Sequence, residues 1–222
     1  MIKKDIKVAV LGAGAMGCLF GGLLAEKGLD VILIDVWKEH VDTINKNGLK
    51  MDGYGGERFI KIKATTEPQT LGKVDAIIIM CKATALEQAL INSKNIIGNN
   101  TVLMSFQNGI GHELIMKKIA GIEKVLGGTT TQAANILGPG NIKNHASLPS
   151  WIGEYEGGMS DRVNDIAETF TAHGLETIAS ENVKKRKWMK LFALTAIGPL
   201  SAMFDMNPVS YTHLTLPTKR IV

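Results

Sequence analysis

The chain has 222 residues, of which 45% are hydrophobic and 21% charged, an ordinary composition for a globular protein with a sizeable core. Its net charge is only +4. We interpret its two basic clusters, "KKDIK" at the N-terminus and "KKRKWMK" at 184–190, as a solvated terminus and a solvated helix face. We therefore expect no nucleic-acid partner. No uninterrupted run of 18 apolar residues occurs, which argues against a membrane span. Cys18 and Cys81 match no metal or redox spacing, so we expect no metal site and a reduced, cytoplasmic environment.

The first half of the chain alternates short apolar strands with helical patterns. Strands are predicted at 6–12, 30–35, 74–82 and 101–106, and helices at 15–28, 38–48, 84–97 and about 111–120. Residues 49–66 are interpreted as a hairpin, because turn glycines fall within 53–56 and "RFIKIK" alternates apolar with polar residues. The strand "VDAIIIMCK" (74–82) is apolar on both faces, as the interior of a parallel sheet requires.

The second half begins with strand-like segments at 125–146, which contain a "GPG" turn, and at 150–155. A helix at about 160–173 and a strand at 175–180 follow. This alternation predicts an α/β fold with a doubly wound, Rossmann-type sheet. From Ser180 the pattern becomes helical, with Ser180 or Asn182 as the cap, and indicates the start of an all-helical second domain.

We therefore divide the chain near residue 180. Residues 1–180 form the predicted dinucleotide-binding domain, and residues 181–207 form the first helix of a truncated helical substrate domain. Residues 208–222, "PVSYTHLTLPTKRIV", have no usable period and resemble translated sequencing-adapter sequence. Our hypothesis is that this tail is non-native and that the natural chain was cut short. A native reading frame that runs unchanged across residue 208 of the source gene would contradict it.

Three glycines in "VLGAGAMG" come directly after the first strand and at the start of the first helix. In that context the spacing favours a dinucleotide site over a ligand-free turn. Gly12 permits the tight turn, Gly14 lets the backbone approach a pyrophosphate, and Gly17 lets the helix close onto the sheet. The amides at the helix start then hold the phosphates. The predicted cofactor-binding residues of the turn are Gly12, Ala13, Gly14, Ala15, Met16 and Gly17.

Asp35 ends the second strand, where an acidic side chain accepts hydrogen bonds from the adenosine ribose. A carboxylate at this position repels a 2′-phosphate, so NADH is favoured over NADPH, although Lys38 lies close enough in sequence to weaken the preference. The interpretation of Asp35 as a surface residue that caps the next helix is compatible with the ribose contact. Flavin binding through the same fingerprint is the rival, and no later segment supports it.

Further motifs follow in a fixed order: "CKA" at 81–83, "QNGIGHE" at 107–113, "GGTTTQAA" at 127–134, "GPG" at 138–140 and "WMKL" at 188–191. Together with "GAGAMG", they make the chain resemble the ketopantoate reductase (2-dehydropantoate 2-reductase) family from about residue 6 to 203. The resemblance implies a Rossmann domain followed by an all-helical domain, with a 2-oxo acid bound between them. It also implies reduction of that acid by NADH or NADPH, as in pantothenate biosynthesis.

Carried over by position, the resemblance implies roles for four further residues. Lys190 matches the family's proton donor. Asn108 and Ala134 match cofactor contacts, and Lys82 matches a lysine at the cofactor and substrate pocket. The substrate contacts implied in this way are Lys82, Asn108 and Lys190.

The chemistry of a lysine suits the proposed role of Lys190. Hydride delivery to a ketone carbon leaves negative charge on the oxygen, and a proton must be supplied as that charge grows. Lysine is a compact cation, and partial burial lowers its pKa toward neutrality. The alternative is a solvated member of the basic cluster, or a side chain that snorkels to water. The nucleotide motif and the "WMKL" match together favour catalysis.

The sequence departs from the family pattern in two ways. The family's proton-donor lysine is followed at i+4 and i+8 by asparagines on the same helix stripe, whereas this chain has Leu194 and Gly198. Two polar substrate contacts, each worth ~1–3 kcal/mol if buried, are therefore missing, which points to a less polar 2-oxo acid or to contacts from elsewhere. The helical domain is also cut short, so apolar residues such as Leu191, Phe192 and Ile197 are expected to be partly bare and to favour aggregation or a homodimer.

Two other functions remain open from the sequence. One is a related Rossmann-plus-helical dehydrogenase that acts on another hydroxy acid or amino acid. The other is a non-catalytic module that binds NAD(P)H without turnover. In every reading the partner is a small molecule, and neither a nucleic acid nor a membrane is expected.

Overall fold

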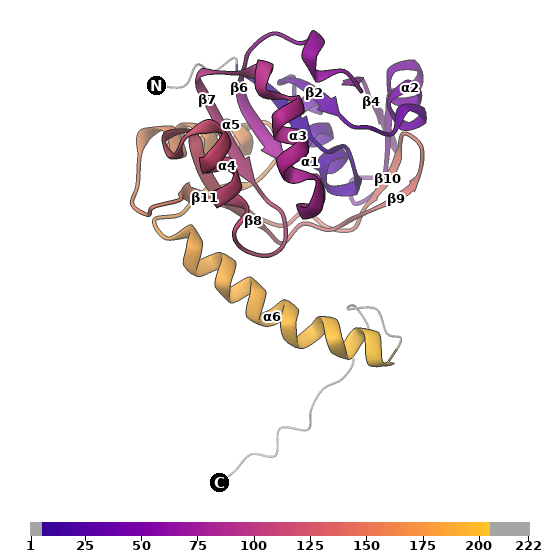
Figure 1. The fold of residues 1–222 in the computed structure, drawn as a ribbon. Coiled ribbons are helices and arrows are strands. Elements are labelled where there is room, and N and C mark those ends of the chain that lie inside the picture. The colour runs from indigo at the N-terminus through magenta and orange to yellow at the C-terminus, as the bar shows by residue number, and fades with distance from the viewer. Residues whose placement is uncertain (1–5, 205–222) are drawn as a thin grey trace.

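An eight-stranded sheet forms the centre of the molecule, in the order β12-β11-β8-β7-β6-β1-β2-β5 (Figure 1). The computed structural model describes residues 6–204. The strands of this sheet are β1 (Lys7–Leu11), β2 (Asp30–Ile34), β5 (Lys63–Thr65), β6 (Val74–Ile79), β7 (Ile97–Ser105), β8 (Val125–Thr130), β11 (Ser150–Glu154) and β12 (Thr177–Ala179). The six strands from β5 to β8 are parallel, and β11 is antiparallel to β8. The predicted doubly wound sheet is confirmed, with its strand order reversing between β1 and β6.

Helices cover both faces of this sheet. Helices α1 (Ala15–Glu26), α2 (Lys38–Asn47) and α5 (Asp161–Ala172) contribute to one core cluster, whereas α3 (Leu86–Asn92) and α4 (His112–Ala120) contribute to the other. Successive residues of a strand point to opposite faces, so Val8 and Val10 join the first cluster while Ala9 and Leu11 join the second. The central strands are therefore apolar on both faces, as the sequence of β6 predicted.

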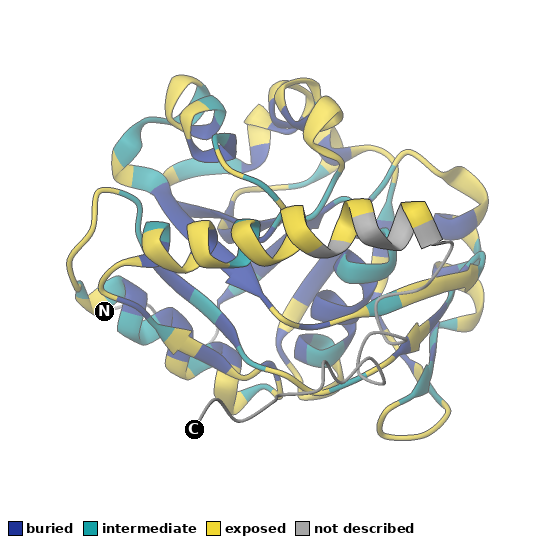
Figure 2. Ribbon diagram, turned by 90° about the horizontal axis from the view of Figure 1, so that it is seen from below, coloured by how far each residue is buried: buried dark blue, intermediate teal, exposed yellow. Residues whose placement is uncertain are grey.

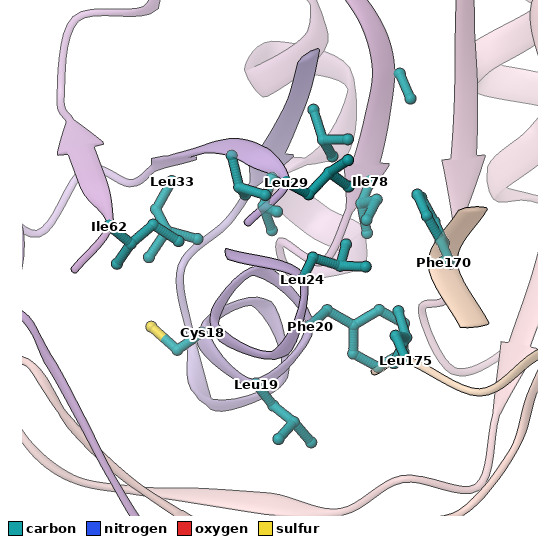
Figure 3. Packing of buried hydrophobic residues seen from close by; sticks show 14 of the residues in the cluster. Cys18, Leu19, Phe20, Leu24, Leu29, Leu33, Ile62, Ile78, Phe170 and Leu175 are labelled. Carbon is teal, nitrogen blue, oxygen red and sulfur yellow. The ribbon is translucent and has the colours of Figure 1, made fainter. Parts of the chain in front are cut away.

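The first helix is anchored by aromatic packing. Phe20 of α1 is fully buried and meets Phe106 edge to face, with ring centroids 4.9 Å apart. Figure 3 shows Phe20 and Leu24 on the side of α1 nearest Phe170. Burial of a phenylalanine contributes about 1.5–3 kcal/mol. This packing fixes the start of α1, and with it the glycine turn that precedes the helix.

A smaller sheet of four strands, in the order β4-β3-β10-β9, lies beside the first. Its strands are β3 (Leu49–Gly53), β4 (Arg58–Ile60), β9 (Ala134–Gly138) and β10 (Asn141–Asn144). The predicted hairpin is present as the antiparallel pair of β3 and β4. Its second arm is shorter than predicted, because β5 leaves it and pairs with β2 in the large sheet. Asn45 holds β5 there through two hydrogen bonds with the Ala64 backbone, at 2.8 and 2.9 Å.

The predicted helix at 84–97 is too long. The structure has a 3-10 turn at Ala83–Ala85, the short α3, and a second 3-10 turn at Lys94–Ile96. The Asn95 side chain donates to the carbonyl oxygens of Pro68 and Leu71, at 2.9 and 3.1 Å, and so draws the chain out of the helix. Strand β7 consequently starts at residue 97 rather than 101.

The last described element is α6 (Val183–Phe204), which extends away from the two sheets (Figure 1). Of the two predicted caps, Asn182 is the one that acts, because its Oδ1 accepts a hydrogen bond from the Lys185 amide at 3.0 Å. Much of the helix surface is exposed (Figure 2). The suspected non-native tail at 208–222 lies outside the described residues. Within residues 6–204, no helix is long and apolar enough to cross a membrane.

Candidate functional site

The glycine turn after β1 is tightly packed at two of its three glycines. Gly12 has a φ of +98°, and a Cβ there would lie 2.4 Å from the Cys81 amide nitrogen at the end of β6. A Cβ on Gly17 would lie 1.9 Å from the Gly12 carbonyl oxygen. Both positions therefore need glycine for the internal reasons that the sequence suggested, a tight turn and a helix close to it.

Gly14 differs from the other two glycines, because a Cβ there would meet no atom within 4 Å. Gly14 is the N-cap residue of α1 and provides no side chain to cap the helix, so the amides of Ala15 and Met16 begin the helix beside open space. A pyrophosphate needs this combination of bare backbone, helix N-terminus and room. The turn at 12–17, which Ala13 completes, therefore fits a dinucleotide.

Asp35 lies beside the same turn. Its Oδ2 accepts a hydrogen bond from the Ala13 amide at 2.7 Å, and its Oδ1 accepts one from the Trp37 amide at 3.0 Å. Asp35 and Gly12 also line a cleft of about 290 Å³ between the ends of β1 and β2 and helix α3. The carboxylate thus supports the turn, contacts the segment that enters α2, and borders the smaller cleft.

A buried chain of hydrogen bonds supports the turn from behind. The Gly140 amide donates to Nδ1 of His40 at 2.9 Å, so Nε2 carries the proton and faces Cys18 Sγ at 3.2 Å. The thiol in turn donates to the Ala13 carbonyl oxygen at 3.1 Å. Burial lowers the pKa of His40 and keeps the imidazole neutral. The "GPG" turn of the small sheet is in this way connected to the glycine turn.

A larger cleft of about 580 Å³ opens where β6, β7 and β8 end, beside the middle of α6. Parallel strands bring their carboxyl ends to one edge of a sheet, and ligands of doubly wound folds bind there. The cleft brings together five of the residues singled out from the sequence: Met16, Lys82, Asn108, Ala134 and Lys190. Gly12 and Asp35 line the smaller cleft instead, and Cys81 lines both.

Lys190 reaches into the larger cleft from α6. Its ammonium group donates to the Thr130 carbonyl oxygen at the end of β8, at 2.7 Å. Burial lowers the pKa of Lys190, and the charge of Lys187 lowers it further. Lys82 lines the same cleft, and none of the cleft's described lining residues is acidic. The electrostatic character of the cleft suits a small anion such as a carboxylate.

Several lining residues were not predicted from the sequence, among them Met80, Phe106 and Gln107. Gln107 donates from Nε2 to the Cys81 carbonyl oxygen and so joins the end of β7 to the end of β6. The available signal was position, since each of these residues lies within two residues of the carboxyl end of a strand.

The two residues that stand where the family has asparagines, Leu194 and Gly198, occupy different environments. Leu194 lines the cleft one turn after Lys190, so an apolar side chain faces the space where an asparagine was expected. Gly198 is absent from the cleft lining, and a Cβ there would meet nothing within 4 Å.

The interpretation of 184–190 as a solvated helix face is wrong for Lys190, which reaches into the cleft, and for Lys187. Lys187 is only 5% exposed and forms an ion pair with Glu113 of α4, which is 1% exposed. Lysine is rarely buried without such a partner. Glu113 lies 74 residues away in sequence, so the basic cluster by itself gave no sign of the pairing.

Several known proteins are similar to this chain. The model of the family described as ketopantoate reductase PanE/ApbA matches residues 8–157. The 2-dehydropantoate 2-reductase of Pyrococcus horikoshii is 38% identical over 91% of this chain, and that of Lactococcus lactis is 30% identical over 91%. The chain spans 65% of the length of both relatives.

Solved structures give a similar result. D-mandelate dehydrogenase, solved with NADH and anilino(oxo)acetate, superposes with a TM-score of 0.86 at 29% identity and covers 95% of this chain and 68% of its own. The PanE/ApbA family ketopantoate reductase from Ralstonia eutropha superposes with a TM-score of 0.82 at 28% identity and covers 90% of this chain and 65% of its own.

Proposed function

This chain belongs to the ketopantoate reductase family, and on that premise we propose that it forms the cofactor-binding part of an enzyme that reduces a 2-oxo acid. The substrate is 2-dehydropantoate or a close analogue, and the reductant is NADH or NADPH. The observation that carries the proposal is the cleft at the carboxyl edge of the sheet, which both Lys190 and Lys82 line beside the glycine turn. The enzyme acts in the cytoplasm.

The proposed division of labour follows from the position of each residue. The amides of the turn from Gly12 to Gly17 bind the pyrophosphate, and Asp35 binds the adenosine ribose. When bound in this way, the nicotinamide supplies a hydride to the substrate carbonyl carbon. Asn108 and Ala134 orient the ring, and Lys82 attracts the substrate carboxylate.

In this scheme Lys190 is the catalytic residue that donates a proton to the carbonyl oxygen as negative charge develops there. The Thr130 carbonyl oxygen holds the ammonium group at the cleft. Burial lowers the pKa of Lys190, which makes the proton easier to transfer. The protonated form is the active one, so the rate falls as pH rises through this lowered pKa.

Residues 1–180 act as the dinucleotide-binding domain, and residues 181–207 belong to the substrate domain. The remaining substrate contacts come from the third of the family's length that this chain does not span.

A second candidate function is reduction of a less polar 2-oxo acid, and the position of Leu194 favours it. An apolar side chain at the cleft leaves a substrate hydroxyl without a partner, which costs about 1–3 kcal/mol. The similarity to D-mandelate dehydrogenase supports an aromatic or branched acid. Comparison of 2-dehydropantoate with branched and aromatic 2-oxo acids, at equal concentration, separates the two candidates.

The proposed function is tested by substitution of Lys190 in a full-length protein that carries residues 1–207. We expect Lys190→Ala to lower kcat for 2-oxo acid reduction by about a hundredfold or more while NADH affinity is kept. Lys185→Ala, which removes an exposed lysine of the same helix, is the matched control and should leave kcat unchanged. An unaltered rate in Lys190→Ala would remove this residue from the mechanism, and NADH binding without oxidation across the panel would favour the non-catalytic module.

A further inference from the structure

The Lys187–Glu113 ion pair lies outside the chemistry described above. Both side chains are almost fully buried, at 4% and 1% exposure. Removing two charges from water costs several kcal/mol per ion, so an apolar pair of the same size would stabilise the fold as well or better. Stability alone therefore does not explain why two charges are present at this position.

The position of the pair relates it to the cleft. Lys187 precedes Lys190 by three residues on α6, and residues with this spacing are neighbours on one helix face. Glu113 is in the first turn of α4, five residues after Asn108. The ion pair therefore joins α6, which carries Lys190, to α4, which follows the Asn108 loop. Both side chains of the pair are buried at this junction.

Two of the other groups around the pair are neutral, and the third, Lys184, is a cation that pairs with Glu156 at 3.8 Å. Burial lowers the pKa of His112, and Lys187 lowers it further, so this imidazole is neutral near pH 7. Burial raises the pKa of Tyr155, so the phenol is neutral as well. Lys184 lies over the Tyr155 ring, 4.1 Å from its centroid.

Lys187 is the charged group that acts directly on Lys190. Glu113 of α4 holds Lys187 in its buried position through the ion pair. Lys82 lines the cleft that Lys190 enters.

We propose that Lys187 and Glu113 are positioning residues for Lys190: the pair fixes α6 against α4 and places a second cation one helical turn behind the reactive amine. The proposal rests on the proposed function in that Lys190 is the proton donor. The second cation weakens the hold of Lys190 on its proton, and the ion pair with the buried carboxylate keeps that cation from turning to water.

The test measures the protonation of Lys190 directly and needs no turnover. The chain is treated with a trace of acetic anhydride at a series of pH values, and acetylation of Lys190 is quantified by mass spectrometry of its peptide. Only the neutral amine reacts. In Lys187→Met, the loss of the neighbouring cation should shift the Lys190 titration to higher pH and slow acetylation at about pH 8 by roughly three- to tenfold.

Two further variants make the result specific. Lys187→Met/Glu113→Gln leaves no unpaired buried charge, and its Lys190 titration should fall between those of the wild type and Lys187→Met. Lys185→Met removes an exposed charge from the same helix and should leave the titration unchanged. Circular dichroism spectra identify any variant that fails to fold. If Lys187→Met does not fold, the comparison of the Lys190 titration in the double variant and the wild type tests the proposal.

A Lys190 titration that is the same in the wild type and the folded double variant would overturn the proposal and leave the reductase function intact. If the titration shifts in the double variant but the full-length protein has no reductase activity, the electrostatic effect of the ion pair stands and the proposed function fails. The ordering wild type, double variant, Lys187→Met, from lowest to highest titration midpoint, is the result that supports the proposal.

Discussion

Asp35 combines two tasks in one side chain. Its two oxygens accept hydrogen bonds from the Ala13 and Trp37 amides, which holds the glycine turn against the start of the next segment. Its negative charge borders the smaller cleft, where we propose that the ribose binds. The structural task uses both oxygens as acceptors, whereas discrimination against a 2′-phosphate needs the charge. Asparagine keeps the shape and one of the two acceptor oxygens and removes the charge, so it alters cofactor discrimination while keeping one of the two hydrogen bonds.

We expect Asp35→Asn to raise the affinity for NADPH relative to NADH by about tenfold, because repulsion of the 2′-phosphate is lost, a term of about 1.4 kcal/mol. The measurement is fluorescence titration of the chain with each cofactor. Asp30→Asn, which neutralises an exposed aspartate at the other end of β2, is the control. If the NADPH to NADH ratio is the same in Asp35→Asn and in the wild type, the carboxylate has no part in cofactor choice.

At the scale of elements, the start of α5 shows how a small polar cluster fixes a helix to a strand. Ser160 caps α5 by accepting a hydrogen bond from the Val163 amide, and it donates to Glu154 of β11 at 2.6 Å. Arg162 donates to both oxygens of Glu154, at 2.6 and 2.5 Å. Burial raises the pKa of Glu154, but these hydrogen bonds and the Arg162 charge outweigh it and lower the pKa below the usual range.

This cluster should make stability depend on acid. A carboxyl with a lowered pKa in the folded state stabilises fully above its unfolded pKa, and the contribution is lost as pH falls through the folded value. We expect Glu154→Gln to lower the free energy of unfolding at pH 7 by about 1 kcal/mol, allowing for partial exposure, with the difference shrinking as pH falls through the lowered pKa of Glu154. Urea unfolding measures it, and Glu156→Gln, at a more exposed site, is the control. A difference that persists undiminished at low pH would show that the charge is not its source.

Local patterns predicted most of the elements. Glycine spacing indicated the turn at 12–17, and the apolar run of β6 indicated a strand buried on both faces. The failures depend on partners far away in sequence. Strand β5 leaves its hairpin because Asn45 binds it, and Lys187 is buried because Glu113 is there to receive it. No periodicity within a short window contains information of that kind.

The candidate site was predictable to a similar degree and for a similar reason. Residues within motifs, such as Lys82, Asn108 and Lys190, do meet in one cleft. The hydrogen bond from Lys190 to Thr130 was not predictable, because the acceptor is a backbone carbonyl oxygen, which every residue type has. The chain of contacts from Gly140 through His40 to Cys18 likewise depends on tertiary geometry.

At the scale of the whole molecule, α6 presents apolar side chains to solvent. Trp188, Met189 and Phe192 are 47%, 62% and 69% exposed, and the Trp188 and Phe192 rings are 6.2 Å apart. Contiguous apolar surface of this kind is typical of an interface. In a full-length family member, the rest of the helical domain would cover it under our proposal. In this chain, we propose that a second copy does.

We expect the chain to form a concentration-dependent dimer through α6, because burial of these side chains removes apolar surface from water. Sedimentation velocity over a range of concentrations measures it. Met189→Glu/Phe192→Glu should be monomeric, whereas Leu114→Glu, which alters an exposed apolar residue of α4, should dimerise as the wild type does. A wild-type chain that stays monomeric at high concentration would contradict the proposal.

The small sheet has a consequence for how the protein is made. Strand β10 pairs with β3 in parallel, and the Gly140 amide reaches His40 across 100 residues of sequence. While the ribosome is still synthesising residues before 140, the glycine turn lacks the support that passes through His40 and Cys18. Contacts of such high sequence separation form late, because a long loop must close first. The first motif to emerge from the ribosome is therefore among the last parts of the protein to acquire its final shape.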